Sequence, residues 1–222
     1  MDIISLEQSD RLYWLGRYAE RVYTTTGLFF NAYDTMLDKF DMEYREFCNK
    51  LDIPNIYQNA DDFCHRYPFD STDSNSLMSN LLRAYDNAIV LREEIGSDAL
   101  CYVQLAIYKM QQAAASDAPL IDFLKVGDHL MSFWGICDDH MENDKARNIL
   151  KLGKRHERLD LFSRLHESSE KLLREEKRLE IYLERAGVKY NELYLNKLKE
   201  IISAPHPDYK EAIIMTEHLL SV

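Results

Sequence analysis

The residues best suited to polar chemistry lie in two copies of one sequence pattern. Residues 12–21 and 149–158 both read apolar-x-x-Leu-Gly-basic-x-x-Glu-Arg. In an α-helix the glycine and the glutamate, four positions apart, lie on one face. Each copy therefore places a point of close approach beside a carboxylate and a guanidinium. Two such helices lying side by side could form one charged site inside a helical bundle.

Such a site can be interpreted in three ways. In a structural interpretation, the two Glu-Arg pairs are buried ion pairs that fix how the helices align. In a binding interpretation, Arg21, Arg92 and Arg158 hold a carboxylate, a phosphate or a peptide terminus, because a guanidinium donates two parallel hydrogen bonds to such anions. In a catalytic interpretation, Glu20 or Glu157 is a general acid or base whose pKa is raised by burial.

The predicted polar network extends beyond these pairs into a central segment, residues 87–97. Its predicted members are Arg17, Glu20, Arg21, Asn87, Arg92, Glu93, Lys154, Glu157 and Arg158. We expect the two Glu-Arg pairs to face each other across the bundle, near Arg92. We also expect Gly16 and Gly153 to be points of close helix packing, since a glycine inside a helix costs about 1 kcal/mol relative to alanine.

A second acidic segment could bind a metal ion. Asp138, Asp139 and Glu142 resemble the Asp-Asp-x-x-Asp sequence with which all-α isoprenoid synthases hold Mg²⁺ and diphosphate. However, no second acidic metal motif is evident, and acidic residues near a helix start are explained more simply by the helix dipole. We therefore predict no metal and no cofactor, and keep these three residues as weak metal candidates.

The elements that position these residues are all predicted to be helices. Only seven glycines and five prolines occur in 222 residues, which favours long helices. Apolar residues recurring every three or four positions predict helices over residues 6–38, 42–51, 61–66, 73–96, 98–115, 117–141, 144–166, 191–202 and 207–221. Ser5 with Gln8 is a predicted capping box, and Ser97 a predicted cap.

The chain after residue 166 can be read in two ways. Residues 167–170 either break the helix or let it continue to Gly187, and the charged residues 170–185 are predicted to be a solvated helix face. No strand is evident. We therefore predict an all-α fold, an antiparallel helical bundle. It would be a single domain over residues 1–222, with a core at about 1–166 and a helical C-terminal extension at about 167–222.

Composition and charge exclude several classes of protein. With 46% apolar and 29% charged residues, the chain is typical of a folded globular protein. Its net charge of −11 disfavours binding to nucleic acid. No window approaches the roughly 20 apolar residues that span a bilayer, and the N-terminus is not a signal peptide. We expect a cytoplasmic protein with no membrane segment, whose four cysteines are reduced.

Three ordered motifs together resemble a known family. They are residues 12–21, the central residues Asn87, Ala88, Arg92, Glu93, Ile95 and Ser97, and residues 152–160. In this order they closely resemble the hallmarks of the bacterial alpha-E family, over roughly residues 6–165. The resemblance implies a helical protein without an established reaction. It also implies partners, since alpha-E proteins are typically encoded beside ATP-grasp-type amide ligases and transglutaminase-like peptidases.

The functional prediction combines the residues with this resemblance. The leading hypothesis is an accessory or binding helical protein that acts with an ATP-grasp-type amide ligase or a transglutaminase-like protein in peptide synthesis or modification. It would hold a peptide or an anionic intermediate and lack catalytic activity of its own. One alternative is an enzyme that uses Glu20 or Glu157 on a peptide or anionic substrate. The other is a purely structural interaction bundle.

Overall fold

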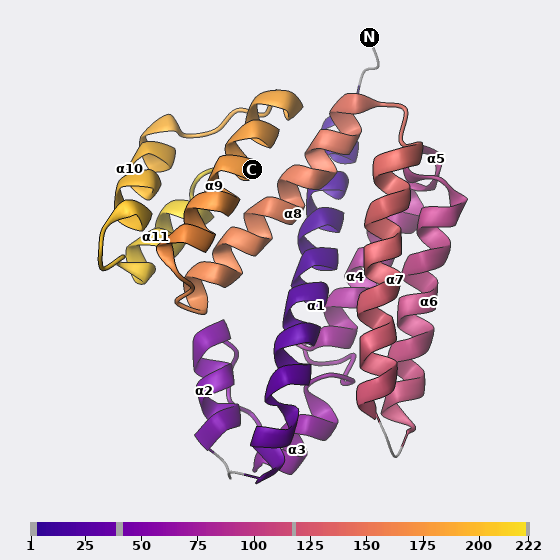
Figure 1. The fold of residues 1–222 in the computed structure, drawn as a ribbon. Coiled ribbons are helices and arrows are strands. Elements are labelled where there is room, and N and C mark those ends of the chain that lie inside the picture. Colours follow the sequence, from indigo (N-terminus) through magenta and orange to yellow (C-terminus); the bar gives the residue numbers. More distant parts are fainter. Residues whose placement is uncertain (1–3, 39–41, 117–118, 221–222) are drawn as a thin grey trace. The chain divides into compact units, whose positions relative to one another are not determined.

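The computed structural model describes residues 4–38, 42–116 and 119–220 (Figure 1). Within these ranges the chain forms eleven α-helices and no strand beyond one isolated bridge between Tyr190 and Leu220. The helices are α1 (Leu6–Asp38), α2 (Met42–Leu51), α3 (Ala60–Arg66), α4 (Leu77–Val90), α5 (Arg92–Ile95), α6 (Ser97–Ala114), α7 (Pro119–His140), α8 (Asp144–Arg164), α9 (Ser169–Ala186), α10 (Glu192–Ser203) and α11 (Tyr209–Glu217). The predicted all-α fold is confirmed.

The chain divides into two compact units. Met1–Arg17 and Asn143–Val222 form one, here called the discontinuous unit, and Tyr18–Glu142 form the other, the central unit. Helix α1 belongs to both, and the predicted C-terminal extension falls in the discontinuous unit together with α8. The assignment of one domain with a boundary near residue 166 stays a prediction.

The central unit has an aromatic core. Helices α6 and α7 form an antiparallel hairpin, and α4 packs against α6 (Figure 1). Phe29 on α1 lies against Phe63, Tyr67 and Phe123, with ring centroids 5.4 to 6.3 Å apart. Phe63 and Tyr67 stack nearly parallel at 4.9 Å. Such large rings bury much apolar area with little demand on orientation, and they join segments that are far apart in sequence.

The discontinuous unit is built from a ring of contacts among its four C-terminal helices. Helix α8 packs against α9, α9 against α10, α10 against α11, and α11 against α8. The helix ends after α8 and a new helix, α9, begins, so the alternative of one continuous helix to Gly187 is wrong. Ser168 starts α9 by accepting a hydrogen bond from the Lys171 amide, and Gly187 ends it with a φ of 61°. This left-handed backbone favours glycine.

Most predicted helix limits lie within a few residues of those observed. The predicted capping box is confirmed, because the Ser5 and Gln8 side chains each accept the other's amide hydrogen at 3.1 Å. The helix predicted over residues 73–96 is wrong in its continuity, since Leu91 interrupts it between α4 and α5. Ser97 is not a cap: Gly96 holds that position, and the Ser97 hydroxyl instead accepts a hydrogen bond from Arg92.

The remaining general expectations concern cysteines and membranes. All four cysteines are free thiols, and three of them, at positions 48, 64 and 137, are buried. Among the described residues, none of the helices is both long enough and apolar enough to cross a bilayer.

Candidate functional site

The two copies of the repeated pattern cross at their glycines. A methyl group added to Gly16 on α1 would overlap the carbonyl oxygen of Leu150 on α8. A methyl group added to Gly153 would overlap the carbonyl oxygen of Tyr13 on α1. Tyr13 and Leu150 each lie three residues before their own glycine, so the contact is reciprocal. The predicted close packing at Gly16 and Gly153 is confirmed.

One turn from this crossing lies a buried ion pair. The Arg17 Nε donates a hydrogen bond of 2.6 Å to Oε2 of Glu157, whose side chain is completely buried. The Arg17 guanidinium also lies 5.2 Å from the centre of the Trp14 ring, a cation–π distance. Burial, the largest single influence, lowers the pKa of Arg17, but the charges of Glu157, Tyr13 and Asp160 and the Glu157 hydrogen bond together raise it. Arg17 and Glu157 therefore form a permanent charge pair within the fold.

Beside this pair, the His156 ring joins two helices. Its Nε2 lies 2.8 Å from the Thr216 carbonyl oxygen on α11, and its Nδ1 lies 2.7 Å from the Tyr13 hydroxyl. A carbonyl oxygen only accepts, so Nε2 carries the proton and Nδ1 accepts from Tyr13. Burial and the nearby Arg17 charge lower the pKa of His156 to about 3. The ring is neutral at physiological pH, with one fixed tautomer.

Two further ionisable groups surround this buried network. Burial raises the pKa of Tyr13 to about 12, so its hydroxyl remains a donor. Burial, followed by the neighbouring Glu157 charge, also raises the pKa of Asp160. Asp160 Oδ2 accepts a hydrogen bond of 3.0 Å from Arg164 Nε, and Arg164 in turn bonds Glu217 at 2.7 Å. The network thus couples α1, α8 and α11 through charge and hydrogen bonds.

The predicted solvated face of residues 170–185 is wrong at two positions. Glu175 and Glu176 on α9 are 3% and 2% exposed. Glu175 accepts hydrogen bonds from Arg155 at 2.9 Å and from Arg178 at 2.6 Å. Glu176 lies 3.6 Å from the Lys199 ammonium, yet burial still raises its pKa. These carboxylates hold α8, α9 and α10 together, a role that a run of charged residues does not reveal.

A cavity of about 740 Å³ lies in the discontinuous unit, beside the first half of α1. Tyr13, Ile149 and Leu152, all from the repeated pattern, form part of its apolar wall. Charged residues of both signs also line it, namely Glu7, Asp10, Lys145 and Lys189. Tyr13 therefore belongs both to the cavity, which its ring lines, and to the buried network, in which its hydroxyl bonds His156. A pocket with an apolar wall and a few charged groups is typical of small-ligand sites.

Other members of the predicted network lie in the central unit. The buried Glu20 accepts a hydrogen bond of 2.8 Å from Thr24 one turn along α1. The charge of Arg21 acts on the buried Tyr67 hydroxyl, whose pKa is raised by burial and partly lowered again by Arg21. Arg92 is exposed on α5 and donates a hydrogen bond of 3.0 Å to Ser97.

The last four predicted network residues are divided between the two units. Asn87 is half-buried on α4 and Glu93 is exposed on α5, whereas Lys154 and Arg158 are half-buried on α8. A single network of all nine residues would join both units, and it stays a prediction. Within the discontinuous unit, the structure pairs Arg17 with Glu157.

The acidic metal candidates receive no support from their surroundings. Asp138 and Asp139 are exposed in the last turn of α7, and Glu142 is exposed just beyond that helix. Within residues 4–38, 42–116 and 119–220, no three side chains of His, Cys, Asp or Glu come together as a metal ion would require.

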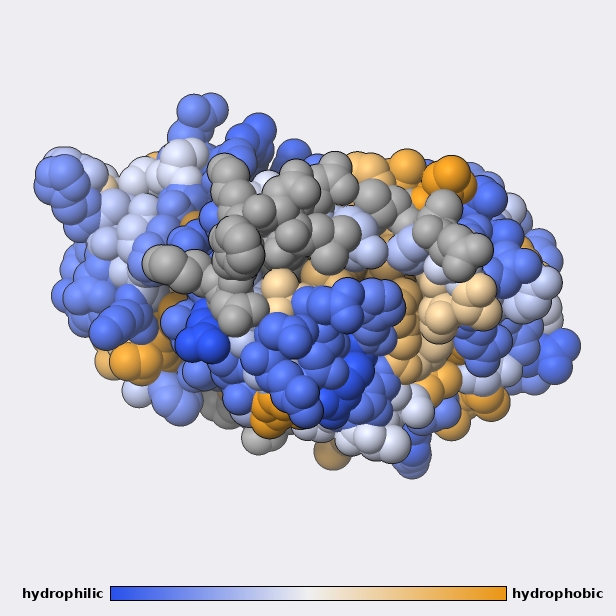
Figure 2. Space-filling model, turned by 90° about the horizontal axis from the view of Figure 1, so that it is seen from below, coloured by the Kyte–Doolittle hydropathy of each residue, from blue (hydrophilic) through white to orange (hydrophobic). Residues whose placement is uncertain are grey.

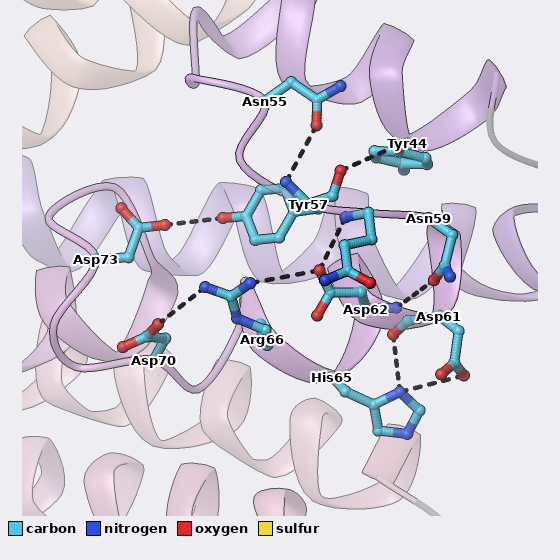
Figure 3. Close-up of polar contacts among 11 residues, drawn as sticks. Tyr44, Asn55, Tyr57, Asn59, Asp61, Asp62, His65, Arg66, Asp70 and Asp73 are labelled. Atoms are coloured by element: carbon cyan, nitrogen blue, oxygen red, sulfur yellow. Dashed lines mark hydrogen bonds and ion pairs between the residues drawn. The ribbon is translucent and has the colours of Figure 1, made fainter.

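Sequence reasoning did not identify a polar cluster around α3 (Figure 3). Arg66 lies between Asp62 at 3.3 Å and Asp70 at 3.8 Å, and over the Tyr57 ring. The Tyr57 hydroxyl donates a hydrogen bond of 2.8 Å to Asp73. The spacing of four residues between Asp62, Arg66 and Asp70 could have predicted the ion pairs. The arginine at the centre therefore links α3, which carries Asp62, to the following loop, which carries Asp70.

Sequence reasoning also missed the roles of Tyr13 and His156. His156 directly precedes Glu157 and so lies on a different face of α8. That difference is what lets α8 meet two neighbours, with His156 reaching α11 and Glu157 reaching α1. In the sequence, the only local signal for this role is a histidine inside a run of charged residues.

Comparison with known proteins gives one match. Residues 8–199 match the model of the family Alpha-E, described as a predicted alpha-helical domain with a conserved ER motif. Both copies of the repeated pattern lie inside this range and both end in Glu-Arg. No curated protein matches the chain, and no solved structure matches it either.

Proposed function

Since this chain belongs to the Alpha-E family, we propose that it is an accessory helical protein that binds a peptide and acts with an ATP-grasp-type amide ligase. In this role it would take part in peptide synthesis or modification without performing the chemistry itself. The observation that carries the proposal is the cavity beside Tyr13, which adjoins the repeated motif and has an apolar wall with charges of both signs.

The chemistry of the cavity fits a short peptide. Ile149, Leu152 and the Tyr13 ring offer an apolar wall to a side chain. The Asp10 carboxylate suits a peptide amine, and the Lys145 ammonium suits a peptide carboxylate. A ligand that carried only one sign of charge would be repelled by whichever of these two groups has the same sign.

The geometry of Glu157 supports binding over catalysis. A general base needs a carboxylate that can reach a substrate proton. The Glu157 carboxylate is completely buried and held at 2.6 Å by Arg17, at the crossing of two helices. We therefore assign the Glu-Arg motif a structural role in shaping the wall of the cavity, and the cavity itself the binding role.

Purification of the tagged full chain from its native host tests the partner. We expect mass spectrometry of the co-purified proteins to identify an ATP-grasp-type ligase, enriched over a control purification with the tag alone. Recovery of the chain without any ligase, after chemical cross-linking in the cell, would contradict the proposed partnership.

Fluorescence anisotropy with a pool of fluorescein-labelled tripeptides tests the ligand. We expect saturable binding that Asp10→Asn weakens by about tenfold, which corresponds to roughly 1.4 kcal/mol. Glu192→Gln is the matched control, since Glu192 is an exposed acidic residue of the same unit that does not line the cavity. Equal affinities of the two variants would place the peptide elsewhere.

A further inference from the structure

The α6–α7 hairpin of the central unit exposes large apolar side chains. Leu105 and Tyr108 on α6 are 37% and 54% exposed. Ile121, Leu124 and Met131 on α7 are 50% to 60% exposed. Scattered apolar residues are normal on a protein surface, but a group of this size on two adjacent helices indicates an interaction site.

These side chains lie on the solvent-exposed sides of two adjacent helices. Residues 105 and 108 are three apart on α6, and residues 121, 124 and 131 recur at helical spacing on α7. The two helices run antiparallel, with Tyr102 near His129 and Lys109 near Asp122. We call Cys101, Leu105, Tyr108, Ile121, Leu124 and Met131 the hairpin face. Figure 2, a view of the molecule from below, shows apolar, tan-to-orange side chains among hydrophilic ones in its right half.

Charge is scarce on and around this face. The sequence of α6 contains one acidic and one basic residue, Asp98 and Lys109, although 29% of the whole chain is charged. The charged residues of α7 between Ile121 and Met131 are the half-buried Asp122 and the exposed Lys125 and Asp128, and Lys125 lies 3.5 Å from Asp122. A second copy of a chain with a net charge of −11 would meet repulsion over most of its surface, and this face avoids it.

The pattern on α7 is complementary to itself. If two α7 helices pack antiparallel through their exposed sides, about a two-fold axis at the level of residue 126, Ile121 lies at the height of Met131 of the second copy. The same axis brings Lys125 close to Asp128 of the second copy, so each charge meets its opposite. A two-fold interface requires this self-complementarity, because one surface patch serves both partners.

We propose that the hairpin face is the interface of a homodimer, in which α6 and α7 of two copies form an intermolecular four-helix bundle. This assembly would bury the five exposed apolar side chains in an apolar core of the kind that helix bundles require. It is independent of the peptide-binding proposal, since the cavity lies in the discontinuous unit and the hairpin face in the central unit.

Sedimentation equilibrium of the full chain, over a range of concentrations, tests the dimer. We expect a mass of twice the 26.1 kDa of one chain. Leu124→Glu should give a monomer with unchanged helical circular dichroism, because Leu124 is exposed and contributes little to the fold. The matched control is Leu193→Glu on α10, which is 80% exposed and outside the hairpin face, and it should remain a dimer.

Exchanging the charges of Lys125 and Asp128 tests whether a second copy of the chain binds the hairpin face. Lys125→Asp should weaken the dimer by about tenfold, since two carboxylates would then face each other at the interface. Adding Asp128→Lys should restore it, because the charges are again opposite across the two-fold axis. Binding of a different protein to this face would not be restored by the double substitution.

Alkylation of Cys101 gives a second readout at the face. Cys101 is exposed whereas the other three thiols are buried. Its reaction with iodoacetamide should slow as the concentration of the chain rises, and should stay fast in the Leu124→Glu variant. A chain that is monomeric at all concentrations, or a dimer that Leu124→Glu leaves intact, would overturn the proposal.

Discussion

The two units of this chain have cores of different chemistry. The central unit is held by rings, such as the stack of Phe63 on Tyr67. The discontinuous unit instead buries an ion pair, Arg17 with Glu157, and a neutral histidine between Tyr13 and a backbone carbonyl. Aromatic rings are stabilised by the apolar area that they bury, whereas each buried polar group needs a hydrogen-bond partner.

This difference predicts how the two cores respond to substitution. Removing one partner from a polar core leaves the other buried and unsatisfied, which costs more than the original interaction contributed. Removing part of a ring leaves a cavity, and the neighbouring rings can partly fill it. We therefore expect the discontinuous unit to be the less tolerant of the two to conservative changes.

The largest expected effect is that of Glu157→Gln. The substitution keeps the shape of the side chain but leaves the Arg17 charge buried without its anion, at a cost of about 3–5 kcal/mol. The comparison in the other core is Phe63→Leu, for which we expect about 1–2 kcal/mol. Urea denaturation of both variants measures the difference. Equal losses of stability would remove the contrast between the two cores.

The next largest effect concerns the helix crossing. Gly153→Ala places a methyl group on the Tyr13 carbonyl oxygen, and the backbones must separate, at a cost of about 2–3 kcal/mol. Gly135→Ala on α7 is the control, because a methyl group there meets no atom within 4 Å. It should stabilise the chain by up to about 1 kcal/mol. Thermal unfolding of the two variants should therefore shift in opposite directions.

The buried histidine makes the stability of the polar core depend on pH. The folded-state pKa of about 3 lies below the ordinary value of 6.5, so the unfolded chain binds the proton more readily. The stabilisation is complete above pH 6.5 and is lost towards pH 3, by roughly 2 kcal/mol between pH 7 and pH 5.

Comparison with His156→Gln isolates this contribution. Asp160 and Glu176, whose pKa values are raised, act with the opposite sign, and they are present in both proteins. Urea denaturation from pH 7 to pH 4.5 should show that the loss of stability on acidification is smaller in the variant. Parallel pH profiles of the two proteins would mean that His156 binds its proton as readily in the folded chain as in the unfolded chain.

The smallest effect is expected at the exposed hydrogen bond between Arg92 and Ser97. Ser97→Ala removes the acceptor, but both groups are exposed and water replaces it, so the change should be within 0.5 kcal/mol, about the usual range for surface positions. Thermal unfolding measures it. A loss above about 1 kcal/mol would show that this hydrogen bond of Arg92, a predicted network residue, has a structural role.

The sequence predicted what depends on neighbouring residues. The capping box of Ser5 and Gln8, the long helix after it and the break at Gly187 follow from local backbone preferences. The repeated glycines also predicted a close approach, because a glycine inside a helix needs a reason of this kind. The all-α fold follows from the same local signals, summed along the chain.

What the sequence could not predict are contacts between distant residues. Arg17 and Glu157 are 140 residues apart, and Tyr13 and His156 are 143 apart. The repeated pattern drew attention to the two Glu-Arg pairs, whereas in the structure Glu157 bonds Arg17, the basic residue after the first glycine. The charged sequence around Glu175 and Glu176 predicts a surface position. Their burial is seen only in the structure, where three helices pack around them.

The division of the chain has a consequence for its synthesis. The first half of α1 meets α8 only after residue 143 has been made, whereas the whole central unit is one continuous stretch of chain. On the ribosome, the central unit can fold before α8 has been made. During this time residues 6–17 remain an exposed helix with an apolar stripe. The reciprocal glycine contact is therefore a late step in folding, and a nascent chain stopped before α8 would present that stripe to chaperones.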